Sequence, residues 1–298
     1  MTLTLALLVI LYFAVFVAAI VGSFFFIKRR ERPKQPFKKD TRLLRGPGES
    51  LLKIINRLDE ELATELIFSM GAPILIGAAA GAACAFLKLT TGNGAGWIAI
   101  LVTFVALLVV SFRLVKKARR RASYYLGYFG ERVVGEILET LKQSGWRIFH
   151  DVPAESGKDE FNIDHVAIGD GGIFGIETKA RRKGDARADR EDQKVFYDGK
   201  KLMWPWGDEE PYGVTNAIDR AKWLEIWLNQ ATGERIRVMP VLTFPEWYVK
   251  ELVVDPRVRV VTSSWLPSVI TARKGVLTEQ QVDLLARQLE QRCRDVVF

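Results

Sequence analysis

The residues of this chain that could do chemistry are gathered in positions 162–179, NIDHVAIGDGGIFGIETK. Two short apolar runs, 163–168 and 173–176, flank the sequence GDGG, which is typical of a turn with positive φ angles. The segment therefore predicts one β-hairpin. If Ile168 pairs with Ile173, Asp164 lies opposite Glu177, and Lys179 lies on the same strand face as Glu177.

Two carboxylates and one ammonium would then meet at the end of this hairpin. Like charges directly opposite each other destabilise a sheet, so Asp164 and Glu177 need a compensating cation. A bound divalent metal ion is the favoured candidate, because Mg²⁺ prefers hard oxygen ligands. The ammonium of Lys179 is a weaker, local alternative.

A third carboxylate is expected from a helix over about 124–143. At about 100° per residue, its apolar stripe consists of Val134, Ile137, Leu138 and Leu141. Glu131 borders this stripe, whereas Glu136 points nearly opposite and is interpreted as a solvated helix residue. A glutamate at the edge of such a stripe usually pairs with a neighbouring cation. The order of acidic helix, strand, Asp strand and Glu-x-Lys strand favours a metal-binding role for Glu131.

The ordered motifs GERVV (130–134), HDV (150–152) and NIDHVAIGDGGIFGIETK (162–179) resemble the nuclease-related domain, NERD. That domain is a branch of the PD-(D/E)XK, or restriction-endonuclease-like, superfamily. The resemblance runs from about residue 130 to the C-terminus and is densest at 146–180. An isolated D-xn-E-x-K spacing is common by chance, but the ordered set is specific.

The resemblance implies an α-β-β-β-α-β core that cleaves phosphodiester bonds with Mg²⁺ or Mn²⁺. It implies that Asp164 and Glu177 are metal ligands and that Glu131 is a further ligand or a water-holding carboxylate. It also implies that Lys179 orients the attacking water and stabilises the developing charge. Glu131, Asp164, Glu177 and Lys179 are therefore the expected catalytic residues.

Basic residues directly after the hairpin are candidates for contact with nucleic acid. Arg181, Arg182 and Lys183 lie where a scissile strand would pass. Phosphate binding and a solvated loop both remain open interpretations of this run.

The helix after the core strands departs from the resemblance. The family pattern often has Asn-Pro followed by Gln there, whereas this chain has Asn216, Ala217 and Arg220. Asn216 and Arg220 are retained as candidate nucleic-acid contacts. The departure leaves the substrate-facing role of this helix open without affecting the expected metal site.

Two other side-chain groups have a structural and a functional interpretation. Trp204 and Trp206 lie in a Pro/Gly-rich loop, where they would stack on bases or pack locally, and packing is favoured. His165 neighbours Asp164 but points to the opposite strand face, so a structural role is expected. His150 is too isolated to be assigned as a general base.

The first 122 residues differ from the rest, because they contain three apolar runs, at about 3–27, 71–88 and 97–115. A bilayer-spanning helix needs about 20 apolar residues, so three transmembrane helices are expected. A retained first helix is favoured over a cleaved signal peptide, since the run has no basic start and is too long. The two cysteines, Cys84 and Cys293, indicate neither a disulfide framework nor a zinc site.

The charge distribution predicts the orientation in the membrane. Residues 123–298 contain 25 Lys and Arg against 28 Asp and Glu, whereas residues 1–122 contain 18 against 7. The excess positive charge behind the net charge of +8 therefore lies in the membrane half. There it is interpreted as a determinant of membrane topology and of attraction to anionic headgroups, in preference to DNA binding. Basic clusters follow the first and third runs, which places the N-terminus outside and residues 28–70 and 116–298 in the cytoplasm.

Two features of this membrane half concern helix packing. Residues 51–66 carry an apolar stripe, which indicates packing on the membrane surface or docking on a partner helix, with the membrane surface as the default. Gly77 and Gly81 form a G-x-x-x-G spacing. Such small residues pack within a helix hairpin, which is favoured here, or form an interface with a second copy or a membrane partner protein.

The expected fold class is α/β, with a restriction-endonuclease-like core in which helices flank a mixed central sheet. This cytoplasmic domain (123–298) is attached to an all-α membrane region (1–122) that includes a linker and an amphipathic helix at 28–70. Beyond the hairpin, strands are expected at 146–152, 237–244 and 258–262 and helices at about 215–230 and 278–294.

The resulting hypothesis is a multi-pass inner-membrane nuclease that acts on the cytoplasmic side. DNA is favoured over RNA as its substrate, and tethering to the membrane suggests defence against foreign DNA. The alternative is a non-catalytic nucleic-acid-binding or scaffold module of a membrane complex. A pore-forming role ranks last, because the apolar runs lack the ionisable residues that mark ion pathways.

Overall fold

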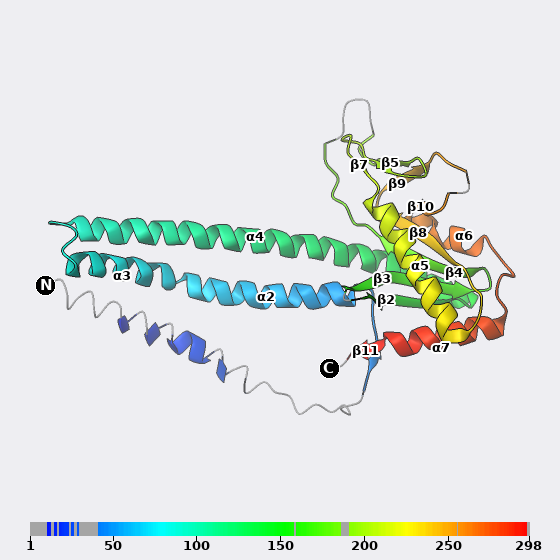
Figure 1. Cartoon of the computed structure of the whole chain (residues 1–298), viewed down its shortest axis with the longest axis horizontal. Helices are drawn as coiled ribbons and strands as arrows, with labels where there is room; N and C mark the ends of the chain where they lie inside the picture. Colours follow the sequence, from blue (N-terminus) through cyan, green and yellow to red (C-terminus); the bar gives the residue numbers. More distant parts are fainter. Residues whose placement is uncertain are drawn as a thin grey trace. The chain divides into compact units, whose positions relative to one another are not determined.

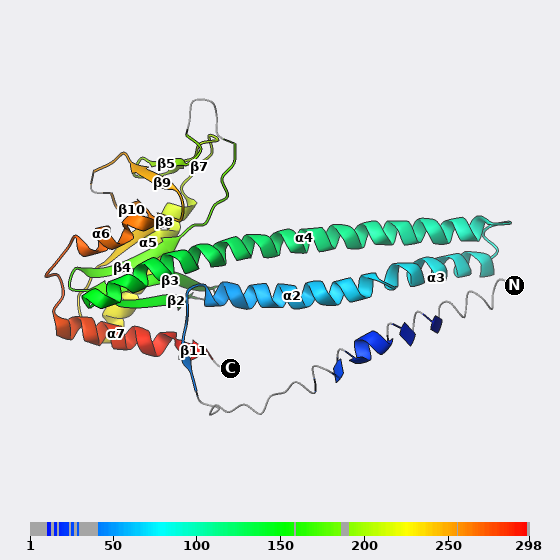
Figure 2. The same cartoon turned by 180° about the vertical axis from the view of Figure 1, so that it is seen from behind.

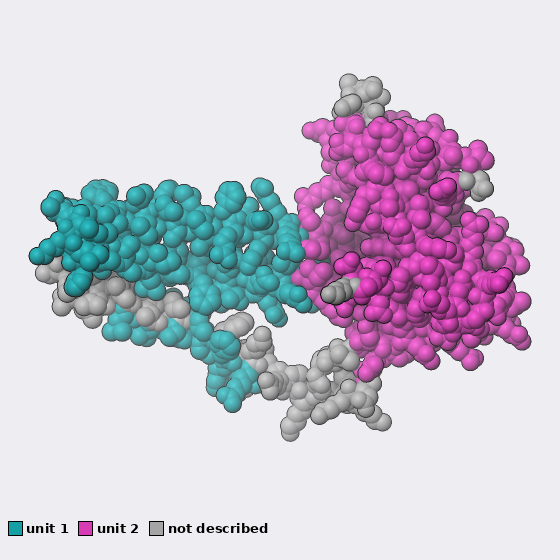
Figure 3. All heavy atoms as spheres, viewed as in Figure 1, with its two compact units in different colours: residues 1–38, 55–122 teal, residues 39–54, 123–298 magenta. Residues whose placement is uncertain are grey.

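The computed structural model describes residues 41–157, 159–185, 191–254 and 256–296, together with residues 11, 12, 15, 16, 18–23, 25, 26 and 29. Its described residues divide into two compact units, coloured separately in Figure 3. Residues 55–122 belong to the first unit. Residues 41–54 and 123–296 belong to the second, so a short segment before the apolar hairpin is part of the α/β domain.

The centre of the second unit is a five-stranded mixed sheet in the order β10-β8-β4-β3-β2. Strands β2 (Arg147–Ser156), β3 (Asp159–Gly169) and β4 (Gly172–Thr178) are antiparallel neighbours, whereas β4, β8 (Val238–Phe244) and β10 (Arg259–Thr262) run parallel. The predicted pairing of Ile168 with Ile173 is confirmed. The turn is tight because Gly172 adopts a φ of 117°, which an L side chain rarely tolerates.

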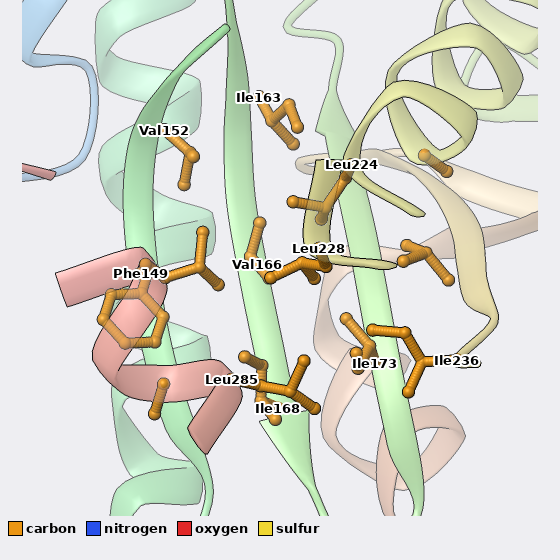
Figure 4. Close-up of a cluster of buried hydrophobic side chains, with 14 of the residues drawn as sticks. Phe149, Val152, Ile163, Val166, Ile168, Ile173, Leu224, Leu228, Ile236 and Leu285 are labelled. Atoms are coloured by element: carbon orange, nitrogen blue, oxygen red, sulfur yellow. The ribbon is translucent and has the colours of Figure 1, made fainter. Parts of the chain in front are cut away.

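Helices cover both faces of this sheet. On one face lie α5 (Tyr212–Thr232) and α7 (Glu279–Cys293), which bury the hydrophobic cluster drawn in Figure 4. On the other face lie the end of α4 (Gly94–Glu139) and α6 (Leu266–Thr271), as the reversed view of Figure 2 shows. Strand residues alternate between the two faces. Val166 and Ile168 face α5 and α7, whereas Ala167 packs in the cluster that contains Val134 and Leu138 of α4. This is the mixed α/β core expected from the sequence.

A second, four-stranded sheet lies beyond one end of α5 (Figure 1) and has the order β7-β6-β5-β9. Its strands are β5 (Lys194–Tyr197), β6 (Leu202–Met203), β7 (Glu209–Glu210) and β9 (Tyr248–Glu251). Trp204 and Trp247 are almost completely buried in the core beneath it. The insertion after β4 therefore packs in a hydrophobic core that it shares with α5, β8 and β10, which fixes the polypeptide next to the end of the hairpin.

The segment before α2 (Glu49–Ser69) is bound to the α/β domain. We call residues 42–50 the strap. Its strand β1 (Leu43–Leu44) pairs antiparallel with the C-terminal β11 (Arg294–Val296). Ser50 donates to the buried carboxylate of Asp151 from its backbone N–H (3.0 Å) and its hydroxyl (2.5 Å). Arg45 also donates to this carboxylate, over 2.9 Å.

Within the first unit, α2 lies against α4. Asp59 pairs with Arg121 over 2.7 Å, and Glu65 pairs with Lys117 over 2.9 Å and with Arg113 over 3.1 Å. Its acidic residues match the basic cluster of α4, so the helix docks on a neighbouring helix, one of the two interpretations of this segment. Packing of its apolar stripe on the membrane surface stays a prediction.

Helix α3 (Ala72–Phe86) also packs on α4. A Cβ at Gly77 would meet the side chain of Thr103 and the carbonyl of Ala99, and one at Gly81 would meet Ala99. The close approach explains the G-x-x-x-G spacing by packing within the hairpin. Two separate helices were expected over 97–115 and 124–143, whereas α4 is one continuous helix across both, because no Pro or Gly pair interrupts its hydrogen bonds.

Two helical stretches of the described residues, Glu49–Phe86 and Gly94–Ser144, are long and apolar enough to cross a membrane by length and composition. The expected first membrane helix, 3–27, and the following linker lie largely outside the described residues. The described part of the chain therefore contains two candidate membrane helices rather than three.

Candidate active site

The two strand carboxylates of the hairpin face α5. The β3–β4 pairing ends at His165 and Ile176, and Asp164 and Glu177 are the adjoining residues of the two strands. Both residues are buried, with 7% of Asp164 and 1% of Glu177 exposed. The backbone N–H of Thr178 donates to Asp164 Oδ2 over 2.7 Å and so fixes the orientation of this carboxylate.

Arg220 of α5 provides the positive charge between these carboxylates. Its Nη1 donates to Asp164 Oδ1 over 2.9 Å and to Glu177 Oε2. The repulsion expected between Asp164 and Glu177 is thus balanced by a guanidinium from a helix more than 40 residues away in the chain. Sequence reasoning assigned Arg220 to nucleic acid, and the structure places it inside the carboxylate pair.

Lys179 lies beside the same pair. Its Nζ is 2.7 Å from Glu177 Oε1, and about a third of its side chain is exposed. Burial is the largest effect and disfavours the ammonium, but the charge and hydrogen bond of Glu177 together with the charge of Asp164 outweigh it and raise the pKa of Lys179. The side chain is therefore a fixed cation with access to solvent. This is the arrangement expected from the Glu-x-Lys spacing.

Two carboxylates of the site, Asp164 and Glu131, hold their protons unusually tightly because their pKa values are raised. Burial and the neighbouring Glu177 raise the pKa of Asp164 to about 7, against the opposing effect of Arg220. Glu131 lies on α4 in the α/β domain, well beyond the apolar run 97–115. Burial, followed by the charges of Asp164 and Asp151, raises its pKa to about 9. Clustered buried carboxylates of this kind are typical of functional sites.

The strap is a part of the site that sequence reasoning missed. Gly48 adopts a φ of 71°, and a Cβ there would lie 2.7 Å from the ring of Tyr128 and 3.6 Å from Glu131 Oε2. The strap therefore passes directly over Glu131. The local signal was the sequence GPGES (46–50), whose turn-forming residues predict a bend but not its partner.

The donor set is chemically suited to a divalent cation. Asp164 and Glu177 provide hard oxygen ligands, and the buried Glu177 Oε1 accepts no hydrogen bond despite its ion pair with Lys179. Among the residues that the structure describes, no three Asp, Glu, His or Cys side chains are grouped closely enough to hold a metal ion. Arg220 instead holds the two strand carboxylates. Arg220 contacts Asp164 Oδ1 and Glu177 Oε2, so a cation on these two oxygens would have to displace the guanidinium.

The other expected nucleic-acid contacts differ in their surroundings. Arg181 is engaged by Glu210 and Asp208 and lies over the ring of Trp204, 4.3 Å from its centroid. Arg182 and Lys183 are exposed. Asn216 is half-buried beside Arg220 in a surface cavity.

The tryptophans and histidines have structural roles, as favoured from the sequence. Trp204 is completely buried, and Trp206 stacks on it with ring centroids 5.6 Å apart. His165 Nδ1 lies 2.8 Å from His150 Nδ1, and His150 Nε2 lies 2.9 Å from Glu139 on the α4 face of the sheet. Burial lowers the pKa of both imidazoles, so this pair stays neutral.

Comparison with known proteins identifies this region. No curated protein and no solved structure matches the chain. Residues 126–245 match the family model of the nuclease-related domain, NERD. The matched segment contains Glu131, Asp164, Glu177, Lys179 and Arg220, whereas the strap and α7 lie outside it. Residues 126–245 of this chain are therefore a nuclease-related domain of the NERD family.

Proposed function

We propose that this chain is a membrane-anchored, metal-dependent nuclease of the PD-(D/E)XK type that hydrolyses phosphodiester bonds, with DNA favoured over RNA. One observation carries the proposal. Asp164, Glu177 and Lys179 meet at one end of a hairpin inside a nuclease-related domain. Two buried carboxylates beside an accessible ammonium supply both the anionic and the cationic groups that phosphoryl transfer requires.

Asp164 and Glu177 would hold Mg²⁺ or Mn²⁺, with Glu131 as a further carboxylate near them. When bound, such an ion lowers the pKa of a water molecule and neutralises charge on phosphoryl oxygens. Lys179 orients the attacking water and donates to the phosphoryl oxygen on which negative charge develops. Glu177 keeps the Lys179 ammonium in place, and the Thr178 N–H keeps Asp164 in its rotamer.

The proposal includes a location. The apolar runs 71–88 and 97–115, together with 3–27, would cross the inner membrane and place the nuclease-related domain in the cytoplasm. The bilayer is then one partner, and the apolar helices offer a surface for a second copy or another membrane protein. Action on DNA that enters through the membrane follows from this location. Cells that lack the protein and restrict phage or plasmid DNA as well as before would contradict the defence role.

One observation favours a second candidate, a non-catalytic nucleic-acid-binding or scaffold module. The ion pairs of Arg220 with Asp164 and Glu177 balance the two strand carboxylates without a metal ion. A scaffold needs no divalent cation at these residues. Metal binding therefore separates the two candidates.

The test uses the full chain in detergent micelles, incubated with single- and double-stranded DNA and RNA. Each reaction contains Mg²⁺, Mn²⁺ or EDTA. Wild type is compared with Lys179→Ala and Asp164→Asn, and Glu136→Gln serves as control because its side chain is 73% exposed on the same helix as Glu131. Metal-dependent cleavage that is lost in the first two variants and kept in the control supports the nuclease. Nucleic-acid binding without cleavage or metal binding supports the scaffold.

A further inference from the structure

A surface cavity of about 450 Å³ opens beside the carboxylates. Its lining includes three aromatic side chains, Phe161, Tyr212 and Trp223, and three polar ones, Asn216, Asp219 and Arg220. This volume is within the range of small-molecule sites, which are mostly apolar with a few placed polar groups. Neither the family match nor the proposed chemistry assigns a function to this cavity.

Five of the lining residues come from one face of α5. Positions 212, 216, 219, 220 and 223 follow the spacing of a single helical stripe. The stripe ends in Arg220 and Trp223, and Arg220 is the residue that contacts Asp164 and Glu177. The cavity and the carboxylates thus share a side chain.

Tyr212 connects the cavity to the catalytic lysine. The ammonium of Lys179 lies 5.6 Å from the centroid of the Tyr212 ring. The tyrosine is 67% exposed at the start of α5, so one face of an aromatic ring is presented to solvent beside Lys179.

Trp223, at the other end of the stripe, has several polar and aromatic partners. Trp223 Nε1 donates to the carbonyl of Glu155 over 2.7 Å. Trp223 also meets Phe161 edge to face, with centroids 5.7 Å apart, and stacks on Trp227 at 6.0 Å. These contacts hold the aromatic wall in one orientation, so a ligand would not have to order it.

We propose that this cavity binds an unpaired nucleobase adjacent to the scissile phosphate, with Tyr212 as its stacking platform. This inference rests on the proposed nuclease function. If the scissile phosphate lies beside Lys179, the base of an adjoining nucleotide is within reach of the neighbouring Tyr212. Aromatic side chains bind any base through its π-face, and Asn216 and Asp219 offer donors and acceptors to its edge. A base inside a duplex has both faces covered and its edge paired, so it would have to leave the stack. The substrate class is therefore single-stranded nucleic acid or a frayed end.

The experiment measures binding in EDTA, where no metal-dependent cleavage occurs, by fluorescence anisotropy of the full chain in micelles. The probes are a labelled oligothymidylate, an abasic strand of the same length, and a duplex. The variants are Tyr212→Ala and Tyr212→Phe. Tyr248→Ala is the matched control, since Tyr248 is 62% exposed on strand β9.

Tyr212→Ala is expected to weaken binding of the oligothymidylate by roughly 5- to 150-fold, which corresponds to about 1–3 kcal/mol per stacked base. Tyr212→Phe and Tyr248→Ala should bind as wild type does. The abasic strand should bind wild type more weakly by a similar factor, and Tyr212→Ala should weaken it no further. This dependence on the base separates stacking from a general structural effect.

Two results overturn the inference alone. Equal weakening of the thymidylate and abasic strands would mean that Tyr212 acts on the backbone or on folding. The second result is a duplex that binds as tightly as the single strand, with an affinity that Tyr212→Ala does not change. It would exclude a base subsite, and the proposed nuclease function would still stand if metal-dependent cleavage persists. A wild-type chain that neither binds nor cleaves any nucleic acid would overturn the proposed function and the subsite together.

Discussion

Arg220→Gln replaces the guanidinium between Asp164 and Glu177 with a shorter, neutral amide. The side chains of these three residues are 22%, 10% and 1% exposed, so the ion pairs are largely shielded from solvent. Opposite charges 4 Å apart attract by about 4 kcal/mol at an effective dielectric constant of 20. Breaking a buried ion pair by removing one partner costs about 3–5 kcal/mol. Without divalent metal, we expect the variant to lose stability of this order.

The same substitution should strengthen metal binding. A cation that binds Asp164 and Glu177 in the wild type must first displace Arg220. If this displacement costs about 1.4–2.8 kcal/mol, wild-type affinity is reduced roughly 10- to 100-fold. The variant has no such cost, and a saturating ligand at about 100 times its Kd stabilises a fold by about 2.7 kcal/mol. Metal should therefore restore much of the stability that Arg220→Gln loses.

The assay combines thermal unfolding with and without Mn²⁺ and calorimetric titration of Mn²⁺ into the full chain. Arg45→Gln is the matched control, because Arg45 also bridges two aspartates, Asp151 at 2.9 Å and Asp295 at 2.6 Å. It should lose stability without gaining affinity for Mn²⁺. If folded Arg220→Gln binds Mn²⁺ no more tightly than wild type, the guanidinium and the cation do not compete, and the reasoning is refuted.

Three further predictions concern the same domain. Lys179→Met should reduce metal-dependent cleavage roughly 10²- to 10³-fold with Mn²⁺ affinity retained, whereas Lys183→Met, at an exposed position, should reduce it far less. The pKa of Glu131 is raised from 4.5 to about 9, so between pH 7 and pH 9 the folded chain holds a proton that the unfolded chain has lost. The free energy of unfolding without metal should therefore fall as the pH rises over this range, by up to about 1.4 kcal/mol per pH unit. Glu131→Gln should reduce this dependence on pH, as measured by chemical denaturation. Gly48→Ala should lower the unfolding temperature more than Gly157→Ala. Both glycines have positive φ, but of the two only Gly48 would place a Cβ against an aromatic ring. Equal decreases in unfolding temperature would show that the strap can move to accommodate the added Cβ.

Local sequence signals were sufficient for the elements that carry the chemistry. Two short apolar runs around a glycine-rich turn predicted the hairpin with Ile168 opposite Ile173, and the structure confirms this pairing. That register places Asp164 opposite Glu177 and Lys179 beside Glu177. Period-two alternation and turn chemistry depend on residues a few positions apart, so they are readable without knowledge of the fold.

The positions of helices were predicted better than their partners. The helix expected at 215–230 is α5, and the final helix expected at 278–294 is α7. The apolar stripe of 51–66 predicted the helix α2, with the membrane surface as its default partner and a neighbouring helix as the alternative. The ion pairs of Asp59 and Glu65 with α4 identify a neighbouring helix as one partner, because a stripe indicates burial without naming the surface that buries it.

By itself, the sequence determined the hairpin, its two carboxylates and lysine, the apolar helices and the nuclease-related character of the chain from about residue 130. Tertiary structure alone decided that Arg220, 56 residues from Asp164, balances the carboxylates, and that Ser50, 101 residues from Asp151, anchors the strap beside Glu131. Neither contact leaves a periodic or local signature. Each exists because folding buries a charge or a polar group, and a buried charge is stable only where the packed chain happens to bring its partner within hydrogen-bonding distance.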